Sequence, residues 1–243
     1  HLAADVGDLD PAVVRVEHEG DPKKSDFAWV TYARGGKVYR LKTRSVVMAG
    51  GCWTTKHVVR DLPSALREAY DQFYRSPYLV ASVALTNWRF LYNLGISGVR
   101  WFGGKIGDYT EVRKSVTFGT PSKTISPDSP TVVTLNVGFL YPGLPTKEQG
   151  NKGRVELLST SFREYERRIR EQFTELFASS GFDARRDIAG IILNRWGHAF
   201  LSPQPGFFFG KDGKPAPRDV LRDAPFGRIA FANTDLSGVL YHP

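Results

Sequence analysis

Residues 227–238, with the sequence GRIAFANTDLSG, contain the pattern that decides the fold. A short apolar run at 227–232 predicts a strand, a tight polar turn follows it, and a helix is expected to begin near Leu236. The free N–H groups of a helix N-terminus suit a pyrophosphate. Asp235 is a fitting acceptor for a ribose or ribityl hydroxyl, or it is only the N-cap of the helix, and the two roles are compatible.

A second stretch near the start of the chain has a related pattern. Residues 45–51, SVVMAGG, predict a strand that ends in small residues, which lets a backbone approach a bulky ligand closely. Strands are also predicted at 13–16, 27–33 and 37–41, the last two joined by a hairpin turn at Arg34-Gly35-Gly36. These strands predict a meander attached to something larger.

The middle of the chain predicts a second group of elements. Helices are expected from Pro63 to Arg75 and over 155–178, the second of which has a regular apolar face. Strands are expected over 78–85, 131–140 and 188–196, and loops over 121–130 and 202–218. The chain is therefore expected to contain both strands and helices, and the resemblance described below implies that they form an α/β fold.

Composition excludes several classes of protein. The chain has 243 residues, one cysteine (Cys52) and a net charge of +8 from 33 basic and 25 acidic side chains. A single cysteine excludes an internal disulfide and thiolate zinc sites within this chain. The basic surplus favours an anionic partner, but its dispersal along the sequence argues against nucleic acid. Uncharged stretches such as 76–88 are too short to span a bilayer.

Most motifs of well-known active sites are absent from the sequence. It contains no GxGxxG, HExxH or GxSxG, and its five histidines are scattered rather than paired at ligand spacing. A P-loop at 98–105 is excluded because Ile106 stands where a magnesium-binding hydroxyl is needed. We therefore expect neither a metal site nor a hydrolytic triad.

Four stretches together resemble a known family. The strand at 13–16, the strand end at 45–51, the sequence NRWGHAF at 194–200 and the segment 227–238 are similar to the C-terminal portion of the flavin-containing amine oxidoreductases. Within that family the chain is most similar to the bacterial spermidine dehydrogenase-like branch. The resemblance covers most of the chain, although residues 93–130 match no named element.

The resemblance implies a two-domain, Rossmann-like FAD-binding fold with a mixed-sheet substrate domain. Residues 1–61 and 186–243 are assigned to the FAD-binding domain, and residues 62–185 to the substrate domain. Val13 is expected to touch the adenine through its backbone, and Gly238 to lie near the isoalloxazine. The other positions assigned to FAD are Ala49, Gly50, Gly51, Asn233, Thr234, Asp235 and Leu236.

Aromatic residues are expected to line the substrate cavity beside the flavin. The resemblance assigns Trp196, Phe207 and Phe208 to this wall, with His198 next to it. From the residues alone, Trp196 is favoured as a core aromatic at a strand end, 207–209 is equally a loop plug over a small core, and His198 favours a structural role. Cys52 is expected to be a buried small residue.

The implied activity is oxidation of a small-molecule amine, polyamine or amino-acid-like, by hydride transfer to flavin N5. No catalytic residue is assigned, because the lysine that many members carry has no counterpart in 78–85. Members of the family usually have an acidic residue at the position of Thr234, whereas in this chain the acid stands one residue later, at Asp235. The GxGxxG half is expected on a separate segment or companion chain, and the alternative is a non-catalytic fragment or partner subunit. Compartment and electron acceptor stay open.

Overall fold

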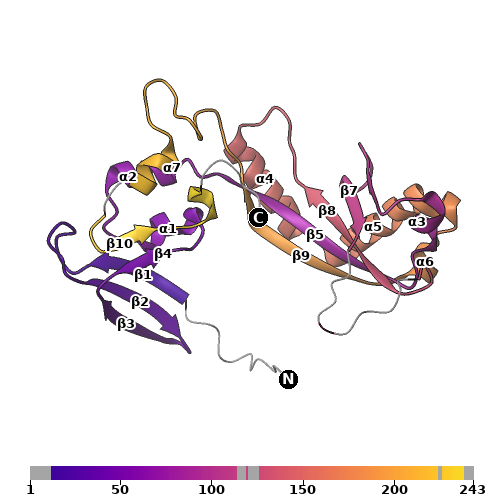
Figure 1. Ribbon diagram of the computed structural model, residues 1–243, viewed down its shortest axis with the longest axis horizontal. Helices are drawn as coiled ribbons and strands as arrows, with labels where there is room; N and C mark the ends of the chain where they lie inside the picture. Colours follow the sequence, from indigo (N-terminus) through magenta and orange to yellow (C-terminus); the bar gives the residue numbers. More distant parts are fainter. Residues whose placement is uncertain (1–11, 114–118, 120–125, 224–225, 238–243) are drawn as a thin grey trace. The chain divides into compact units, whose positions relative to one another are not determined.

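The computed structural model describes residues 12–113, 119, 126–223 and 226–237 (Figure 1). The chain divides into two compact units: unit 1 is His1–Tyr74 with Leu201–Pro243, and unit 2 is Arg75–Phe200. Sequence analysis placed the domain boundaries at 61/62 and 185/186. In the structure both boundaries lie later in the chain, at 74/75 and 200/201, for two reasons. Helix α2 (Ser64–Tyr70) packs in the core of unit 1, and strand β9 (Ile188–Leu201) belongs to the sheet of unit 2.

Unit 1 contains the expected meander. Strands β1 (Ala12–His18), β2 (Ala28–Arg34) and β3 (Lys37–Thr43) form an antiparallel sheet, and the glycine turn between β2 and β3 has φ of +56° and +72°. Strands β4 (Val46–Met48) and β10 (Ile229–Phe231) pair in parallel, with Ile229 opposite Val46 (Figure 1). The strand predicted over 227–232 is therefore present but shorter, at 229–231.

The helices of unit 1 differ from the prediction. The helix that follows Pro63 ends at Tyr70 instead of Arg75, because Arg75 begins a strand of unit 2. Helices α1 (Cys52–Val58) and α7 (Pro217–Asp223) were not predicted. One core collects side chains from all these elements, including Val16, Leu66, Leu221, Ile229 and Leu236.

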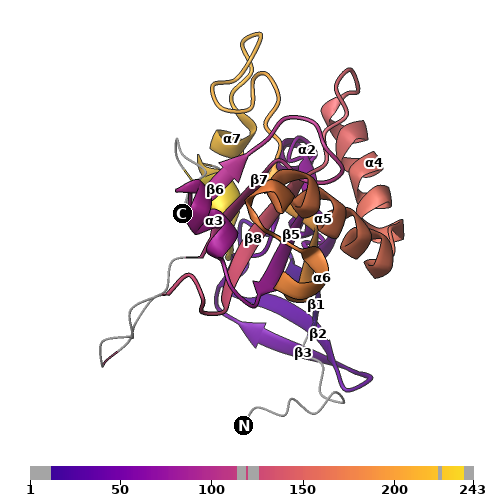
Figure 2. The ribbon, with the colours of Figure 1, turned by 90° about the vertical axis from the view of Figure 1, so that its right-hand side faces the viewer.

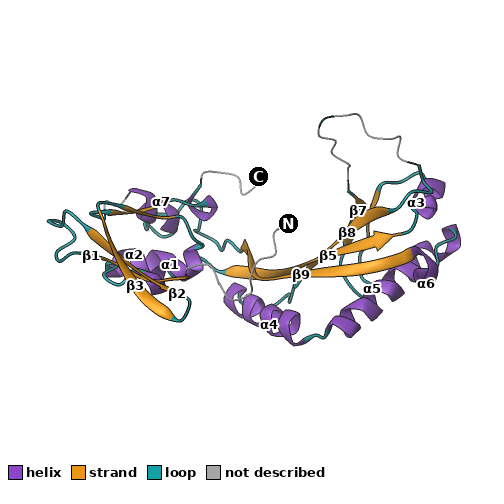
Figure 3. Ribbon diagram, turned by 90° about the horizontal axis from the view of Figure 1, so that it is seen from below, coloured by secondary structure: helices purple, strands orange, loops and turns teal. Residues whose placement is uncertain are grey.

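Unit 2 is built on one five-stranded sheet. Its strand order is β6 (Gly98–Arg100), β7 (Tyr109–Val112), β8 (Thr131–Gly138), β5 (Arg75–Leu85) and β9. Helices α4 (Thr146–Ser159) and α5 (Phe162–Phe177) lie along one face of this sheet (Figure 3). Short helices α3 (Arg89–Leu94), η1 (Ala178–Ser180) and α6 (Ala184–Asp187) lie near α5 at one end (Figure 2).

The expected single helix over 155–178 is wrong. Two helices occupy this region, and the chain leaves the helical conformation at Thr160 and Ser161. Ser161 caps α5 by accepting the N–H of Glu164 at 3.2 Å. The first helix also begins earlier than predicted, at Thr146.

Strand β5 separates the two faces of the sheet. Alternate residues such as Leu79 and Val83 are buried in the core, whereas Tyr78 and Val80 point to the other side. We call the side away from the core the open face. It carries Tyr78, Val80, Asn136, Ile192, Trp196 and Phe200. No helix among the described residues is both long and apolar enough to cross a membrane.

Candidate functional site

The candidate cofactor site of unit 1 lies at the carboxyl ends of β4 and β10. Because these strands are parallel, the segments that follow them leave the same edge of the sheet. Ala49 and Gly50 follow β4 and are exposed, and Ala232 follows β10 and is also exposed. Two exposed stretches of small residues thus adjoin each other at the edge where open α/β sheets bind ligands.

The side chain of Asn233 joins these two segments. Its amide nitrogen donates to the backbone oxygen of Gly50 at 2.8 Å. Its amide oxygen accepts the N–H groups of Asp235 at 3.0 Å and Leu236 at 3.2 Å. Asn233 is therefore the cap of the short helix η2 (Thr234–Leu236), and the sequence-based assignment of the cap to Asp235 is wrong.

The remaining assigned positions of unit 1 have different surroundings. Thr234 is exposed, whereas Asp235 and Leu236 are buried at 4% and 5% exposure. Val13 lies on β1 with 46% of its surface exposed. Gly238 lies outside the described residues, as does the continuation of the helix expected from Leu236.

Glycines 50 and 51 differ in what would limit a side chain there. A Cβ atom at Gly51 would lie 2.7 Å from the indole nitrogen of Trp53, so the protein itself requires glycine at this position. A Cβ at Gly50 would meet nothing closer than Thr54 Oγ1 at 3.9 Å. The packing of unit 1 therefore leaves room above Gly50.

Cys52 follows these glycines and begins α1. It is fully buried, as predicted, and its sulfur lies 3.3 Å from the amide nitrogen of Asn233. Burial, with a contribution from nearby Cys52, raises the pKa of Tyr70 behind it. This packing holds the Asn233 side chain in place.

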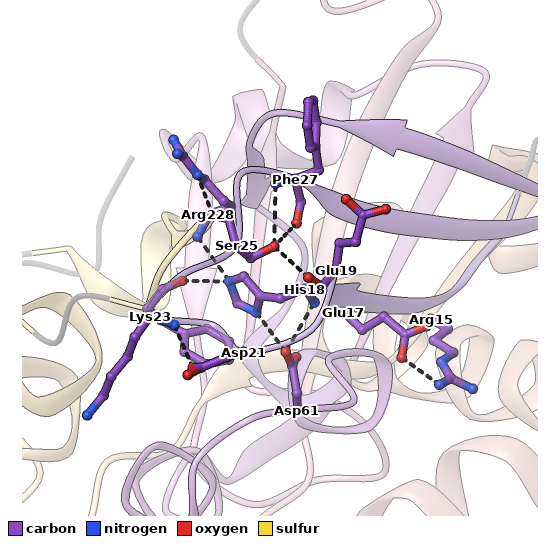
Figure 4. A network of polar contacts seen from close by, with 11 residues as sticks. Arg15, Glu17, His18, Glu19, Asp21, Lys23, Ser25, Phe27, Asp61 and Arg228 are labelled. Atoms are coloured by element: carbon purple, nitrogen blue, oxygen red, sulfur yellow. Dashed lines mark hydrogen bonds and ion pairs between the residues drawn. The ribbon is translucent and has the colours of Figure 1, made fainter.

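A polar network contacts the residues just before β10, at the opposite end of this strand from Asn233 (Figure 4). His18, on β1, is buried, and its Nδ1 lies 2.7 Å from Oδ2 of Asp61. The backbone N–H of Arg228 donates to Nε2 of His18 at 3.0 Å. The Arg228 guanidinium reaches Ser25 O and the Asp26 carboxylate. Residues on three separate segments thus meet immediately before Ile229.

In unit 2, Trp196 lies on the open face. Its side chain is exposed, at 58%, so the alternative of a core aromatic is not what the structure shows. The neighbouring even-numbered residues Ile192 and Asn194 are exposed as well, while Leu193 packs on the core. Phe200 packs edge-on against Tyr78 with ring centroids 4.8 Å apart.

His198 has the surroundings of a structural residue. Its Nδ1 lies 3.5 Å from the Arg154 guanidinium, and its backbone oxygen accepts from Arg75 Nε at 3.0 Å. Burial, followed by the positive charges of Arg154 and Arg75, lowers the pKa of His198. The imidazole is therefore neutral at neutral pH.

Phe207 belongs to the core of unit 1. It is 1% exposed and packs against Phe73 with centroids 4.9 Å apart, as the core-plug alternative predicted. Phe208 packs against Phe207 and lies under the Arg218 guanidinium at 4.8 Å. Phe209 is the exposed ring of the three, at 91%. A cavity wall made by Phe207 is therefore a wrong prediction, because its ring has no free surface.

Two candidate residues were missed by sequence analysis. Tyr78 shares the open face with Phe200, and the sequence carries no clear signal for this, because residues 76–85 are apolar at nearly every position. His18 carried no motif, and only the fold brings it to Arg228. Within the described ranges, no group of three or more His, Cys, Asp or Glu side chains is placed to hold a metal ion.

Comparisons with known proteins give the fold of the chain. No protein-family model and no curated protein matches its sequence. Among solved structures, a triple mutant of putrescine oxidase aligns with a TM-score of 0.61 at 13% identity, over 95% of this chain and 44% of the other. Wild-type putrescine oxidase bound to putrescine gives 0.57 at 12% identity, over 93% of this chain and 43% of the other.

A third similar structure is cyclohexylamine oxidase from Brevibacterium oxydans. It aligns with a TM-score of 0.53 at 16% identity, over 93% of this chain and 42% of the other. The chain thus spans less than half the length of each solved structure named here. At these identities the likeness establishes the fold: this chain has the mixed α/β fold of part of the putrescine oxidase and cyclohexylamine oxidase chains.

Proposed function

We propose that this chain is part of an FAD-dependent amine oxidoreductase. Unit 1 supplies part of the FAD-binding domain, and unit 2 supplies the substrate domain. The fold shared with two amine oxidases supports the proposal. The single observation that carries it is the paired strand end of unit 1, where exposed small residues after β4 and β10 are held together by Asn233.

The residues at this edge fit a dinucleotide. The packing of unit 1 does not require glycine at position 50, because a Cβ there would meet nothing closer than 3.9 Å. Glycine at this position permits a close backbone approach to a ligand. Thr234 is exposed beside it. The amide of Asn233 is used inside the protein, so its role is to hold the turn rather than to contact the phosphates. The contacts of Asp235 with a ribose or ribityl hydroxyl stay a prediction.

When bound, FAD would supply the acceptor for a hydride from the carbon next to a neutral amine. The task of this chain's residues is to bind and orient the amine and to exclude water. The open face suits this task, because Trp196, Phe200 and Tyr78 offer aromatic surface to an alkyl or ammonium group. The assignment to the spermidine dehydrogenase-like branch is the narrower form of the proposal, which turnover of spermidine tests.

The edge of β4 supports a companion segment. Val46 N–H donates to Arg228 O at 2.8 Å, and Met48 O accepts from Ala232 N–H at 3.1 Å, so the polar groups of Val47 point away from β10. Val47 is 62% exposed, and β10 is the one strand neighbour of β4 among the described residues. Parallel sheets are normally larger and covered on both faces. We therefore place the proposed GxGxxG-bearing segment beside β4.

The test is FAD binding by the purified chain, alone and after mixing with a candidate GxGxxG-bearing polypeptide. Flavin absorbance in both samples supports a binding-competent chain, and absorbance only after mixing supports a split enzyme. Stoichiometric FAD without amine turnover favours the alternative of a non-catalytic partner subunit. No FAD binding in either sample contradicts the proposed function.

A matched pair of glycine variants places the cofactor. Gly50→Val should weaken FAD binding at least about tenfold, because the new side chain fills the space above the strand ends. Unfolding should stay within about 0.5 kcal/mol of wild type. Gly190→Val, on β9, is the control because a Cβ there would meet nothing within 4 Å and the position lies outside the proposed FAD site. Equal FAD binding by wild type and the Gly50 variant would remove this edge from the site.

A further inference from the structure

Three chain segments meet at the buried imidazole of His18. The ring itself is 0% exposed, and it lies on β1 between Asp61, which follows α1, and residues 226–228, which lead into β10. Its edge also packs against the ring of Phe226, with centroids 4.7 Å apart. Any change in its hydrogen bonding is therefore transmitted to backbone rather than to solvent.

The hydrogen bonds select one tautomer of the ring. A backbone N–H can only donate, so the 3.0 Å contact from Arg228 requires an unprotonated Nε2. Nδ1 then carries the proton and donates it to Asp61 Oδ2 at 2.7 Å. The same carboxylate oxygen accepts the backbone N–H of His18 at 3.1 Å, which fixes the orientation of the pair.

A second acceptor faces the same ring nitrogen. The backbone oxygen of Phe226 lies 3.2 Å from Nε2, where it has no proton to accept while the ring is neutral. Protonation of Nε2 reverses this arrangement, because the new N–H can donate to Phe226 O but can no longer accept from Arg228. The ring therefore has two hydrogen-bonding states, each with a different peptide group of the same turn.

The turn between these two peptide groups has little freedom to adjust. Gly227 has φ of +53°, and a Cβ there would lie 2.6 Å from His18 Nε2 and in contact with Pro22 O. The next residue is already part of the parallel pairing, since Arg228 O accepts the N–H of Val46 at 2.8 Å. A change at Arg228 N–H is thus passed directly to the pairing of β10 with β4.

One carboxylate contacts the ring directly, since Asp61 Oδ2 lies 2.7 Å from Nδ1. The Arg228 guanidinium turns to Ser25 O and Asp26 instead of the ring (Figure 4). Glu19, Asp21 and Lys23 lie on the segment after His18, where Lys42 pairs with Glu19 and the Lys23 N–H binds Asp21.

From this geometry we infer that His18 and Asp61 form a proton-sensitive clamp that positions the start of β10. In the neutral state the clamp holds Arg228 N–H, and in the protonated state it releases that group and binds Phe226 O. His18 is therefore a positioning residue for residues 226–228, which lead into β10. Its effect on FAD rests on the proposed function, whereas the clamp itself does not.

The test follows the clamp in the chain itself, without FAD. Nitrogen-15 chemical shifts of the His18 ring should show the Nδ1–H tautomer while Nε2 is unprotonated, and the doubly protonated ring once the sample is acidified enough to protonate Nε2. As Nε2 becomes protonated, the exchange protection factor of Arg228 N–H should fall about fivefold, as expected for one lost hydrogen bond. The amide of Asp71, bonded to Arg67 O in α2, is the internal control.

Two variants separate the clamp from general stability. In His18→Gln the side-chain amide can accept from Arg228 and donate to Phe226 O at once, so Arg228 protection should lose its pH dependence. Asp61→Asn keeps hydrogen bonding but removes the charge, so the midpoint of the Arg228 transition should move to lower pH. His57→Gln, at an exposed histidine of α1, should change neither.

Three results would overturn the inference. They are an Nε2–H neutral tautomer, an Arg228 protection factor that does not follow His18 titration, and an unchanged pH profile in His18→Gln. FAD binding is measured separately in the same variants. A working clamp without FAD binding would contradict the proposed function alone, and FAD binding without the clamp would contradict this inference alone.

Discussion

The turn after β10 in unit 1 and the part of β9 around Trp196 in unit 2 differ in which groups they use. The turn is held through backbone groups, whereas this part of β9 exposes side chains. The turn depends on backbone groups that one amide side chain holds together, since Asn233 contacts Gly50, Asp235 and Leu236. Strand β9 instead presents side chains to solvent, among them Trp196 at 58% exposure. Side-chain identity should therefore matter for structure in the first region and for ligand contact in the second.

The strongest test of this contrast is Asn233→Ala. The variant removes the cap of η2 and the bond to Gly50 O, so the free energy of unfolding should fall by about 2 kcal/mol. Urea denaturation followed by circular dichroism measures the loss. Thr234→Ala, at the exposed next position, should change stability by less than about 0.5 kcal/mol. A similar small change in both variants would mean that Asn233 does not hold the turn.

The same contrast explains what sequence reasoning could predict. The strand expected over 131–140 was placed correctly, because burial on one face leaves a repeat of two in the sequence of β8. The strand–turn pattern at 227–236 was also correct. Its cap was assigned to the wrong residue, because Asn233 and Asp235 are both good capping types and only the fold shows which reaches Gly50.

The missed start of α4 has a specific cause. Residues 146–154 contain Gly150 and Gly153, which lower helix propensity and favour a loop. In the structure both glycines are buried. Neither position has room for a side chain, because a Cβ at Gly150 would lie 2.7 Å from Arg75 O and one at Gly153 would lie 2.7 Å from Pro77 Cγ. Tertiary packing selects glycine here for close approach of the helix to β5, and a single sequence cannot distinguish this reason from a loop.

A second substitution tests the side-chain half of the comparison. Trp196→Ala should leave the free energy of unfolding within about 0.5 kcal/mol of wild type, because the ring is mostly exposed. In the FAD-loaded enzyme it should lower kcat/KM for an amine about tenfold, the size expected for one lost aromatic contact. Exposed Ile192→Ala, four residues away, is the matched control. Loss of FAD content with unchanged turnover per bound FAD would place Trp196 at the cofactor instead.

The smallest effect that we expect concerns the stability of the fold at acid pH, and it depends on Asp187. This residue lies directly before the start of β9, away from Trp196. Hydrogen bonds from Arg186, with others from Asp183 N–H and Asn87, lower the pKa of this buried carboxyl group. A carboxyl whose pKa is lower in the folded state stabilises the fold above its unfolded value, about 3.9, and loses that contribution as the pH falls through the folded-state pKa.

Asp187→Asn should therefore cost about 1 kcal/mol at neutral pH and make unfolding less sensitive to acid. Urea midpoints at about pH 7 and about pH 3 measure both effects. Asp128→Asn is the control, because the pKa of Asp128 is also lowered by a hydrogen bond, from Arg89, but both partners are exposed and the pair should contribute little. Equal losses in the two variants would show that burial does not distinguish these carboxylates. A larger loss at Asp187 would show that its buried carboxyl group contributes to the acid sensitivity of unit 2.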